Sequence, residues 1–172
     1  MPDFNSVPLM PQAHYRVDIQ WNYLEDWLAG HGDIFDLEPD FQRAHVWTEA
    51  QQVAYIEWIM RGGESGRELT FNCPGWPNGR KIEKGSGVIV DGKQRLHAVR
   101  RFLRGEIAPF DFRFSEWTGR MRLHLSFGIR IGNLKTREEV LGWYLDFNAG
   151  GTQHTTEEIE KVRALLAKEK AR

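Results

Sequence analysis

The sequence predicts an α+β fold: one domain with a small mixed sheet and about five helices. Apolar residues alternate with a period of two in some segments and recur at helical spacing in others. The 172 residues contain no internal repeat and no convincing linker, so we expect a single domain over residues 1–172. Hydrophobic residues make up 41% of the chain and charged residues 27%, which is ordinary for a globular protein.

Strands are predicted where short apolar or alternating segments are bounded by turn residues. In the last two segments the alternation is strong, and Thr118-Gly119 lies between them. We therefore expect these two strands to form a hairpin whose turn is Trp117–Arg120. The expected strands cover His14–Gln20, Leu69–Cys73, Gly87–Asp91, Phe110–Phe114 and Met121–Ile131.

Helices are predicted where capping residues precede apolar residues at helical spacing. Capping boxes are formed by Thr48 and Gln51, by Thr136 and Glu139, and by Thr155 and Glu158. The expected helices cover Tyr23–Ala29, Thr48–Met60, Lys93–Arg104, Thr136–Phe147 and a last segment that starts at Thr155. We expect Asp36–Arg43 to be extended and Pro74–Gly87 to be a loop, because Pro and Gly disfavour regular structure there.

Composition narrows the possible environments and partners. The formal charge is −1, whereas a protein that coats DNA non-specifically normally carries a large positive excess, so any nucleic-acid contact must come from a local basic patch. The single Cys73 excludes an internal disulfide and fits a reducing cytoplasm. No apolar run approaches the ~20 residues that span a bilayer, and the N-terminus lacks the pattern of a signal peptide. We expect a soluble, intracellular protein with no membrane partner.

The apolar residues Val88-Ile89-Val90 of the third expected strand are followed by Asp91-Gly92-Lys93-Gln94-Arg95, so the strand leads into a helix through a glycine. The first turn of a helix exposes unpaired N–H groups, which favour a phosphate. Gly92 allows close approach of a ligand to the backbone, and Lys93 and Arg95 add positive charge. Asp91 either caps the helix or holds Mg²⁺ on the phosphates. The alternative is an ordinary strand–helix junction with solvated side chains.

The charge of this helix supports the first interpretation. A helix start normally favours acidic residues, yet no acid occurs between Gly92 and Gly105. A bound anion would account for this inverted charge. The basic residues of the helix are Lys93, Arg95, Arg100, Arg101 and Arg104.

Three segments, in order along the chain, resemble the N-terminal domain of GmrSD-type restriction factors, a family of the ParB/sulfiredoxin-like superfold. Pro39–Trp47 is similar to the family's Pro-x-(Tyr/Phe)-Gln-Arg-x-x-x-Trp signature, and Ile89–Leu96 is similar to its Asp-Gly-Gln-Gln-Arg motif. Phe147–Thr152 resembles its late Asn-x-x-Gly turn. The resemblance covers residues from about Asp36 to Glu158.

The resemblance implies that the Asp-Gly-Lys-Gln-Arg loop binds and hydrolyses a nucleoside triphosphate, ATP or another NTP, with Mg²⁺. It implies this work for Asp91, Gly92, Gln94 and Arg95, with Gln42 and Arg43 converging on the same pocket. Lys93 departs from the family, which has Gln there. Gln42 and Arg43 are otherwise exposed residues of an extended segment.

The late turn is the third predicted part of the site. Gly150 and Gly151 can take positive φ, so the turn either forms a nest of N–H groups facing phosphate or simply connects two helices. The predicted ligand-binding residues of this turn are Asn148, Gly150, Gly151 and Thr152.

The first functional hypothesis is an NTP-dependent phosphotransferase or NTPase. Its acceptor is either a hydroxyl, such as one on a modified DNA base, or water. Catalysis would rest on positioning and on charge neutralisation by Arg95, Lys93, Arg43 and Mg²⁺. Asp40 and Asp91 are the candidate proton acceptors. A compact domain of this kind would suit a phage or mobile-element gene for DNA modification or defence.

Two alternatives belong to other classes: a nucleotide-gated, ParB-like DNA-binding switch and, ranked lowest, a metal-dependent DNA nuclease. A sulfiredoxin reaction needs a reactive Cys at the nucleotide loop, and Cys73 lies elsewhere in the sequence.

Some residues outside these motifs have competing interpretations. Trp117, Arg120 and Arg122 combine stacking and charge in a way that suits nucleic acid, or they form a solvated turn. His97 is either an acid or base near the basic loop or a packing residue. The histidines show no metal-ligand spacing.

Overall fold

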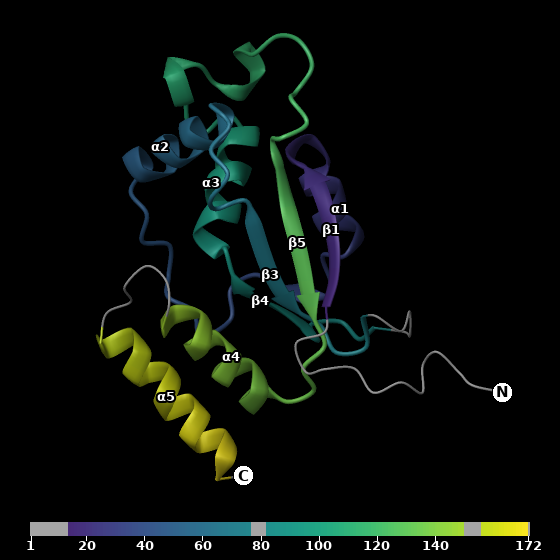
Figure 1. The fold of residues 1–172 in the computed structure, drawn as a ribbon, viewed down its shortest axis with the longest axis vertical. Helices are drawn as coiled ribbons and strands as arrows, with labels where there is room; N and C mark the ends of the chain where they lie inside the picture. The colour runs from purple at the N-terminus through teal and green to yellow at the C-terminus, as the bar shows by residue number, and fades with distance from the viewer. Residues whose placement is uncertain (1–13, 77–81, 150–155, 172) are drawn as a thin grey trace, which may run out of the picture.

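The computed structural model describes residues 14–76, 82–149 and 156–171, and it confirms the α+β class (Figure 1). A five-stranded mixed sheet has the order β1-β5-β3-β4-β2. β1 is antiparallel to β5, β5 is parallel to β3, β3 is antiparallel to β4, and β4 is parallel to β2. The strands are β1 (His14–Gln20), β2 (Phe35–Asp36), β3 (Glu68–Asn72), β4 (Gly87–Asp91) and β5 (Ser126–Gly132).

The five expected helices are present in the described residues. Thr48 forms its predicted capping box with Gln51, and the Thr136 hydroxyl accepts a hydrogen bond from the N–H of Glu139. The Thr155 cap lies outside the described residues. The helices are α1 (Leu24–Gly30), α2 (Glu49–Met60), α3 (Lys93–Leu103), α4 (Arg137–Ala149) and α5 (Thr156–Lys170), with short 3₁₀ helices η2 (Trp21–Tyr23), η4 (Pro109–Asp111) and η5 (Phe114–Glu116). None of the described helices is long and apolar enough to cross a membrane.

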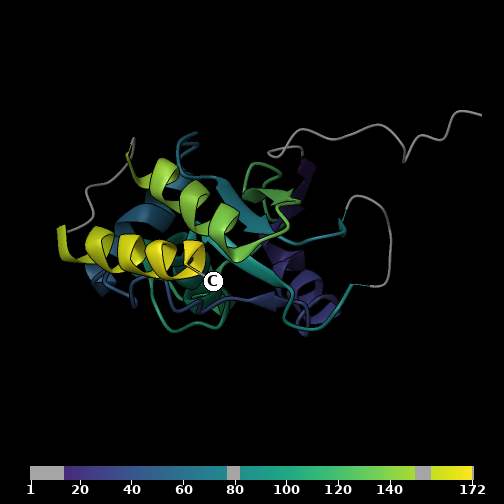
Figure 2. The same cartoon turned by 90° about the horizontal axis from the view of Figure 1, so that it is seen from below.

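The two faces of the sheet bury different clusters. One face contributes Phe71, Ile89 and Ile129 to the main core, which also includes residues of α1, α2 and α3. The other face is covered at one end by α4 and α5, where a smaller cluster contains Val90, Leu141 and other apolar residues. Figure 2 shows α4 and α5 on one side of the molecule and α1 on the other. The sheet thus separates the two cores.

Asn72 joins β3 to the segment that leads into α4. Its side chain is buried, donates to the carbonyl of Leu134 at 3.1 Å and accepts from the Leu134 N–H at 2.8 Å. Both hydrogen bonds join the end of β3 to the backbone of Leu134, a residue of the smaller cluster. They fix the start of α4 against the end of β3.

The predicted hairpin of Phe110–Phe114 with Met121–Ile131 is wrong. Residues Pro109–Asp111 and Phe114–Glu116 form 3₁₀ helices, and the strand in the second segment is only Ser126–Gly132. That strand pairs with β1 on one side and with β3 on the other, so neither of its edges is free for a hairpin partner. Phe114 packs instead against Phe102 of α3 at a ring distance of 5.3 Å.

The boundary of α4 also differs from the expectation. The helix continues to Ala149 rather than ending near Phe147, so Asn148 is helical. Gly150, Gly151 and Thr152 of the predicted turn lie outside the described residues, as does His154.

Candidate functional site

The turn between β4 and α3 has the predicted strand–glycine–helix geometry. Gly92 has a φ of 97°, and a Cβ built on it would lie 2.5 Å from Leu69 Cδ2, so this position requires glycine. No side chain caps α3, and its first turn contains no acidic residue. The backbone N–H groups that a helix leaves unpaired at its start are therefore not taken up by a side-chain cap, which suits an anion.

Lys93 points away from solvent toward the Pro39–Trp47 segment. It is only 6% exposed, and its Nζ lies 2.5 Å from Glu38 Oε2 and donates to the Arg43 carbonyl at 3.1 Å. Burial opposes ionisation of Glu38, but hydrogen bonds from Lys93 and His45 outweigh it and hold the pKa of that carboxyl below its ordinary value. The charge of Lys93 is thus already matched within the fold.

Gln94 and Gln42 complete the attachment between the two predicted motifs. Gln94 Nε2 donates to the carbonyl of Ala44 at 3.0 Å, and its Oε1 accepts the N–H groups of Val46 and Trp47 at 3.1 and 3.3 Å. Gln42 Nε2 donates to the Ile89 carbonyl at 2.6 Å. The structure therefore brings these segments together, and both side-chain amides do so by hydrogen bonds to backbone groups.

Asp91 and Arg95 form an ion pair at the same turn. Arg95 Nη2 donates to Asp91 Oδ2 at 2.6 Å, and the side chains of Arg95 and Asp91 are 21% and 44% exposed. Arg95 also lies beside Gly66, where a Cβ would meet its Cδ at 3.6 Å. This pair is the more accessible part of the site.

Asp40 stands apart from this pair. Both of its carboxylate oxygens accept from Arg137 Nη2 at 2.8 Å, and the adjacent Phe41 packs against Tyr144 at a ring distance of 5.1 Å. Asp40 thus faces α4. The side chain of Asn148, the other predicted residue on α4, is not described.

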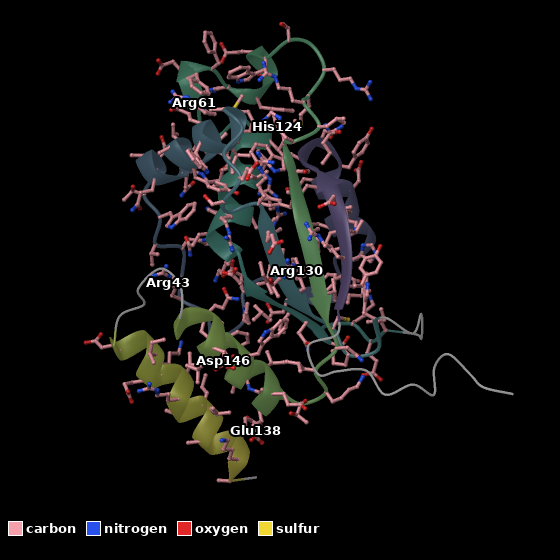
Figure 3. The ribbon with its side chains drawn as sticks, in the orientation of Figure 1. Arg43, Arg61, His124, Arg130, Glu138 and Asp146 are labelled. Carbon is pink, nitrogen blue, oxygen red and sulfur yellow. The ribbon has the colours of Figure 1, made fainter. Side chains whose placement is uncertain are left out.

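Arg43 belongs to the same segment and has interaction partners of its own. Its carbonyl is tied to Lys93. Figure 3 shows Arg43 in the segment between β2 and α2. Because its carbonyl is bonded to Lys93, the backbone of Arg43 lies close to the first turn of α3.

The basic character of α3 has an explanation within the fold. Each basic residue that the sequence singles out on this helix pairs with an acid, and for all but Arg95 that acid lies in another segment. The inverted charge of the helix therefore does not by itself require a bound anion, and the uncapped helix start is the stronger feature. The pairs are Lys93 with Glu38, Arg95 with Asp91, Arg100 and Arg104 with Glu25, and Arg101 with Glu49 and Glu106.

Sequence reasoning missed a pair of stacked histidines beside Lys93. The rings of His45 and His97 are 3.8 Å apart between centroids at 23°, and His45 Nε2 lies 2.9 Å from Glu38 Oε1. Burial, followed by electrostatic repulsion from the neighbouring His45, lowers the pKa of His97 below its ordinary value. Lys93 and His97 are four residues apart on one helix face, but no sequence pattern identifies His45 as their neighbour.

The remaining candidates for chemistry are Cys73 and a metal cluster. Cys73 is buried, and its pKa is raised chiefly by burial, which makes its thiol a poor nucleophile. Among the described residues, no three His, Cys, Asp or Glu side chains are grouped to hold a metal ion.

Comparisons of the chain with protein-family models, with curated proteins and with solved structures gave no match. The resemblance noted in the sequence is therefore carried by its three motifs alone.

The burial of Lys93 predicts that Glu38→Gln lowers the free energy of unfolding. The ammonium would lose its counter-charge, and we expect a cost of about 1–2 kcal/mol, less than the ~3–5 of a fully buried pair because Glu38 is 61% exposed. Urea unfolding at neutral pH measures this change in the free energy of unfolding. Glu64→Gln, at an exposed position between α2 and β3, is the control. The double variant Glu38→Gln with Lys93→Met should recover part of the loss. Equal stability of Glu38→Gln and wild type would contradict this account.

The lowered pKa of His97 predicts acid sensitivity. The unfolded state, with an ordinary histidine pKa near 6.5, binds a proton before the folded state does, so stability is complete above that pH and is lost as the pH falls toward the folded pKa. Thermal unfolding of wild type and His97→Gln from pH about 7.5 to about 5 should show a shallower decline in the variant. The same decline in both proteins would rule out His97 as the source.

Proposed function

We propose that this protein binds a nucleoside triphosphate with its phosphates at the first turn of α3 and transfers the terminal phosphoryl group. The observation that carries the proposal is the start of α3: it is uncapped, free of acids and held against the Arg43 segment. Unpaired N–H groups with arginines near them favour an anionic ligand such as a phosphate group. The resemblance to nucleotide-hydrolysing domains points the same way.

The Asp91–Arg95 pair would exchange partners when nucleotide binds. The Arg95 guanidinium would leave the carboxylate for phosphate oxygens, which accept two of its N–H groups. Asp91 would then be free beside the phosphates, where a single carboxylate, phosphate oxygens and water are the usual ligands of Mg²⁺. When bound, Mg²⁺ would neutralise charge on the transferred group. The partial exposure of both side chains permits this exchange.

Lys93 would act from a buried position at the first turn of α3. Its Nζ is held by Glu38 and the Arg43 carbonyl, so it fixes the segment that carries Arg43, and the Glu38 carboxylate offsets part of the positive potential that it adds at the helix start. A positive charge held in a fixed position would stabilise the negative charge that develops on the transferred phosphoryl group, and no rearrangement is needed during the reaction. The family's Gln contributes no charge at this position.

In the chemical step, the bond from the terminal phosphorus to its bridging oxygen breaks as a bond to the acceptor oxygen forms. The proton of the acceptor passes to a carboxylate. Asp91 lies at the turn, whereas Asp40 would first have to leave Arg137. Asp91 is therefore the better placed of the two, and it would accept the proton on the carboxylate oxygen that does not hold Mg²⁺. Gly92, Gln94, Gln42 and the Asn148–Thr152 turn complete the proposed nucleotide site.

A hydroxyl acceptor, such as one on a modified DNA base, is proposed ahead of water because a fixed lysine charge stabilises transfer but does not orient a water molecule. The ParB-like switch is the alternative, since the same site would bind nucleotide in both. A nuclease needs Asp40 and Asp91 on one metal, and the structure pairs each with a different arginine.

Arg95→Ala should weaken triphosphate binding about 10- to 100-fold, because a charge-assisted contact contributes about 1.5–3 kcal/mol. Titration calorimetry with ATP and the other NTPs in Mg²⁺ measures it. Arg104→Ala removes the same charge from the far end of α3, where Arg104 pairs with Glu25, and should bind as wild type does. Equal affinities of Arg95→Ala and Arg104→Ala would place the phosphates elsewhere.

Lys93→Gln should lower the rate of phosphoryl transfer more than it lowers nucleotide affinity, since the charge acts mainly in the transition state. A labelled γ-phosphate assay with hydroxymethylated DNA, unmodified DNA and no DNA measures transfer, and Lys161→Gln on α5 controls for net charge. Circular dichroism confirms that Lys93→Gln is folded. Label released only as free phosphate, at a rate indifferent to DNA, would leave a simple NTPase.

A further inference from the structure

A second cavity, of about 720 Å³, lies at the opposite end of α3 from the proposed phosphate site. The C-terminal parts of α2 and α3 and the 110–125 segment line it, and Figure 1 shows these elements together at the top of the molecule. Its volume falls within the range of sites for small organic ligands, roughly 300–1,000 Å³. Because α3 has 11 residues, about 15 Å separates its ends, so this cavity does not belong to the site at Asp91.

The wall of the cavity offers aromatic surface. Phe102, Phe110, Phe114 and Trp117 all contribute to it. Trp117 is 39% exposed, and its ring lies nearly perpendicular to Phe110 at 6.1 Å and to Phe112 at 6.0 Å. Its indole N–H already donates to the Phe112 carbonyl at 3.3 Å. What Trp117 presents to a ligand is therefore its ring surface rather than a hydrogen-bond donor.

The rim of the cavity is positively charged. Arg61, Arg120 and Arg122 line it, and none of its described lining residues is acidic. Arg61 lies over the Phe110 ring at 5.0 Å and meets Glu57 only at 3.9 Å. Figure 3 shows Arg61 at the end of α2, next to the 110–125 segment. Three guanidinium groups around an aromatic cavity complement a ligand that is both planar and anionic.

The backbone around the cavity is held in place despite strain. Phe110 and Asp111 have φ values of 55° and 65°, which are uncommon for residues with a side chain. Glu57 Oε1 accepts the Phe110 N–H at 2.8 Å, and Gln20 Nε2 donates to the carbonyls of Met121 and Arg122 at 3.2 and 3.1 Å. Strained backbone that is fixed from neighbouring elements is concentrated at ligand sites.

We propose that this cavity binds a nucleotide unit of a single-stranded nucleic acid, with the base against Trp117 and the phosphates at Arg120 and Arg122. Stacking on an aromatic ring beside arginines is how unpaired bases are bound without sequence preference. A base within a duplex cannot enter, because its faces are covered by neighbouring pairs. The small net charge of the chain, −1, fits a local patch better than a coating of DNA.

The test is fluorescence anisotropy with a labelled oligothymidylate of about 12 nucleotides, a duplex of the same length, and thymidine monophosphate as competitor. Trp117→Ala should weaken binding of the single strand about 5- to 100-fold, whereas Trp58→Ala should not, since Trp58 is also exposed but lies outside the cavity. Arg120→Gln with Arg122→Gln should flatten the dependence of log affinity on log salt by about 0.7 for each phosphate that the protein no longer neutralises. Arg163→Gln on α5 is the charge control.

Binding that depends on Trp117 and strengthens with chain length supports a nucleic-acid strand, and equal binding of the monophosphate identifies a free nucleotide as the source of the same chemistry. Equal affinity of Trp117→Ala and Trp58→Ala, a duplex bound as tightly as the single strand, or no binding at all would overturn the proposal. If Trp117→Ala does not fold, Trp117→Phe and the arginine variants provide the test. Arg95→Ala should bind the oligonucleotide normally, which separates this proposal from the proposed function.

Discussion

The ion pair between the buried Lys93 and Glu38 is the interaction on which the site depends. It joins two segments that lie about 50 residues apart in the sequence. The same ammonium also donates to the Arg43 carbonyl, which strengthens the connection. A buried ammonium without a partner costs much free energy. Moving the Pro39–Trp47 segment away from α3 would leave Lys93 in that state, so the segment stays packed against the helix. Gln94 strengthens this attachment with three hydrogen bonds to the same segment. The position of Arg43 follows from these contacts.

The same turn also positions α3 against the main hydrophobic core. Gly92 brings the start of α3 against Leu69 of β3, and α3 then buries Leu96, Val99 and Phe102 in the main core. A side chain at position 92 would push α3 away from the sheet. Packing of the helix and exposure of its uncapped first turn are therefore consequences of one backbone geometry.

The two ends of α3 differ in how their charges are matched. At the first turn, Arg95 forms its only described ion pair with Asp91, whose side chain is the more exposed of the two. Farther along, Arg100 and Arg101 are tied to acids on α1 and α2 and hold those helices in place. Beyond the helix, at the second cavity, the arginines of the 110–125 segment face a wall whose described residues include no acid. Charge is therefore structural along the middle of α3 and accessible near its two ends.

Local patterns in the chain were enough to predict the elements whose signals are local: the capping box of Thr48 and most strands and helices. They also predicted the strand–glycine–helix geometry of the β4–α3 turn. Which side chains are free to act depends on long-range packing, because the burial of Lys93 requires Glu38, a partner that no local pattern identifies. The failed hairpin has the same cause. Alternation reports that a segment suits a sheet, whereas pairing depends on which edges distant strands leave free, and β1 and β3 occupy both edges of β5.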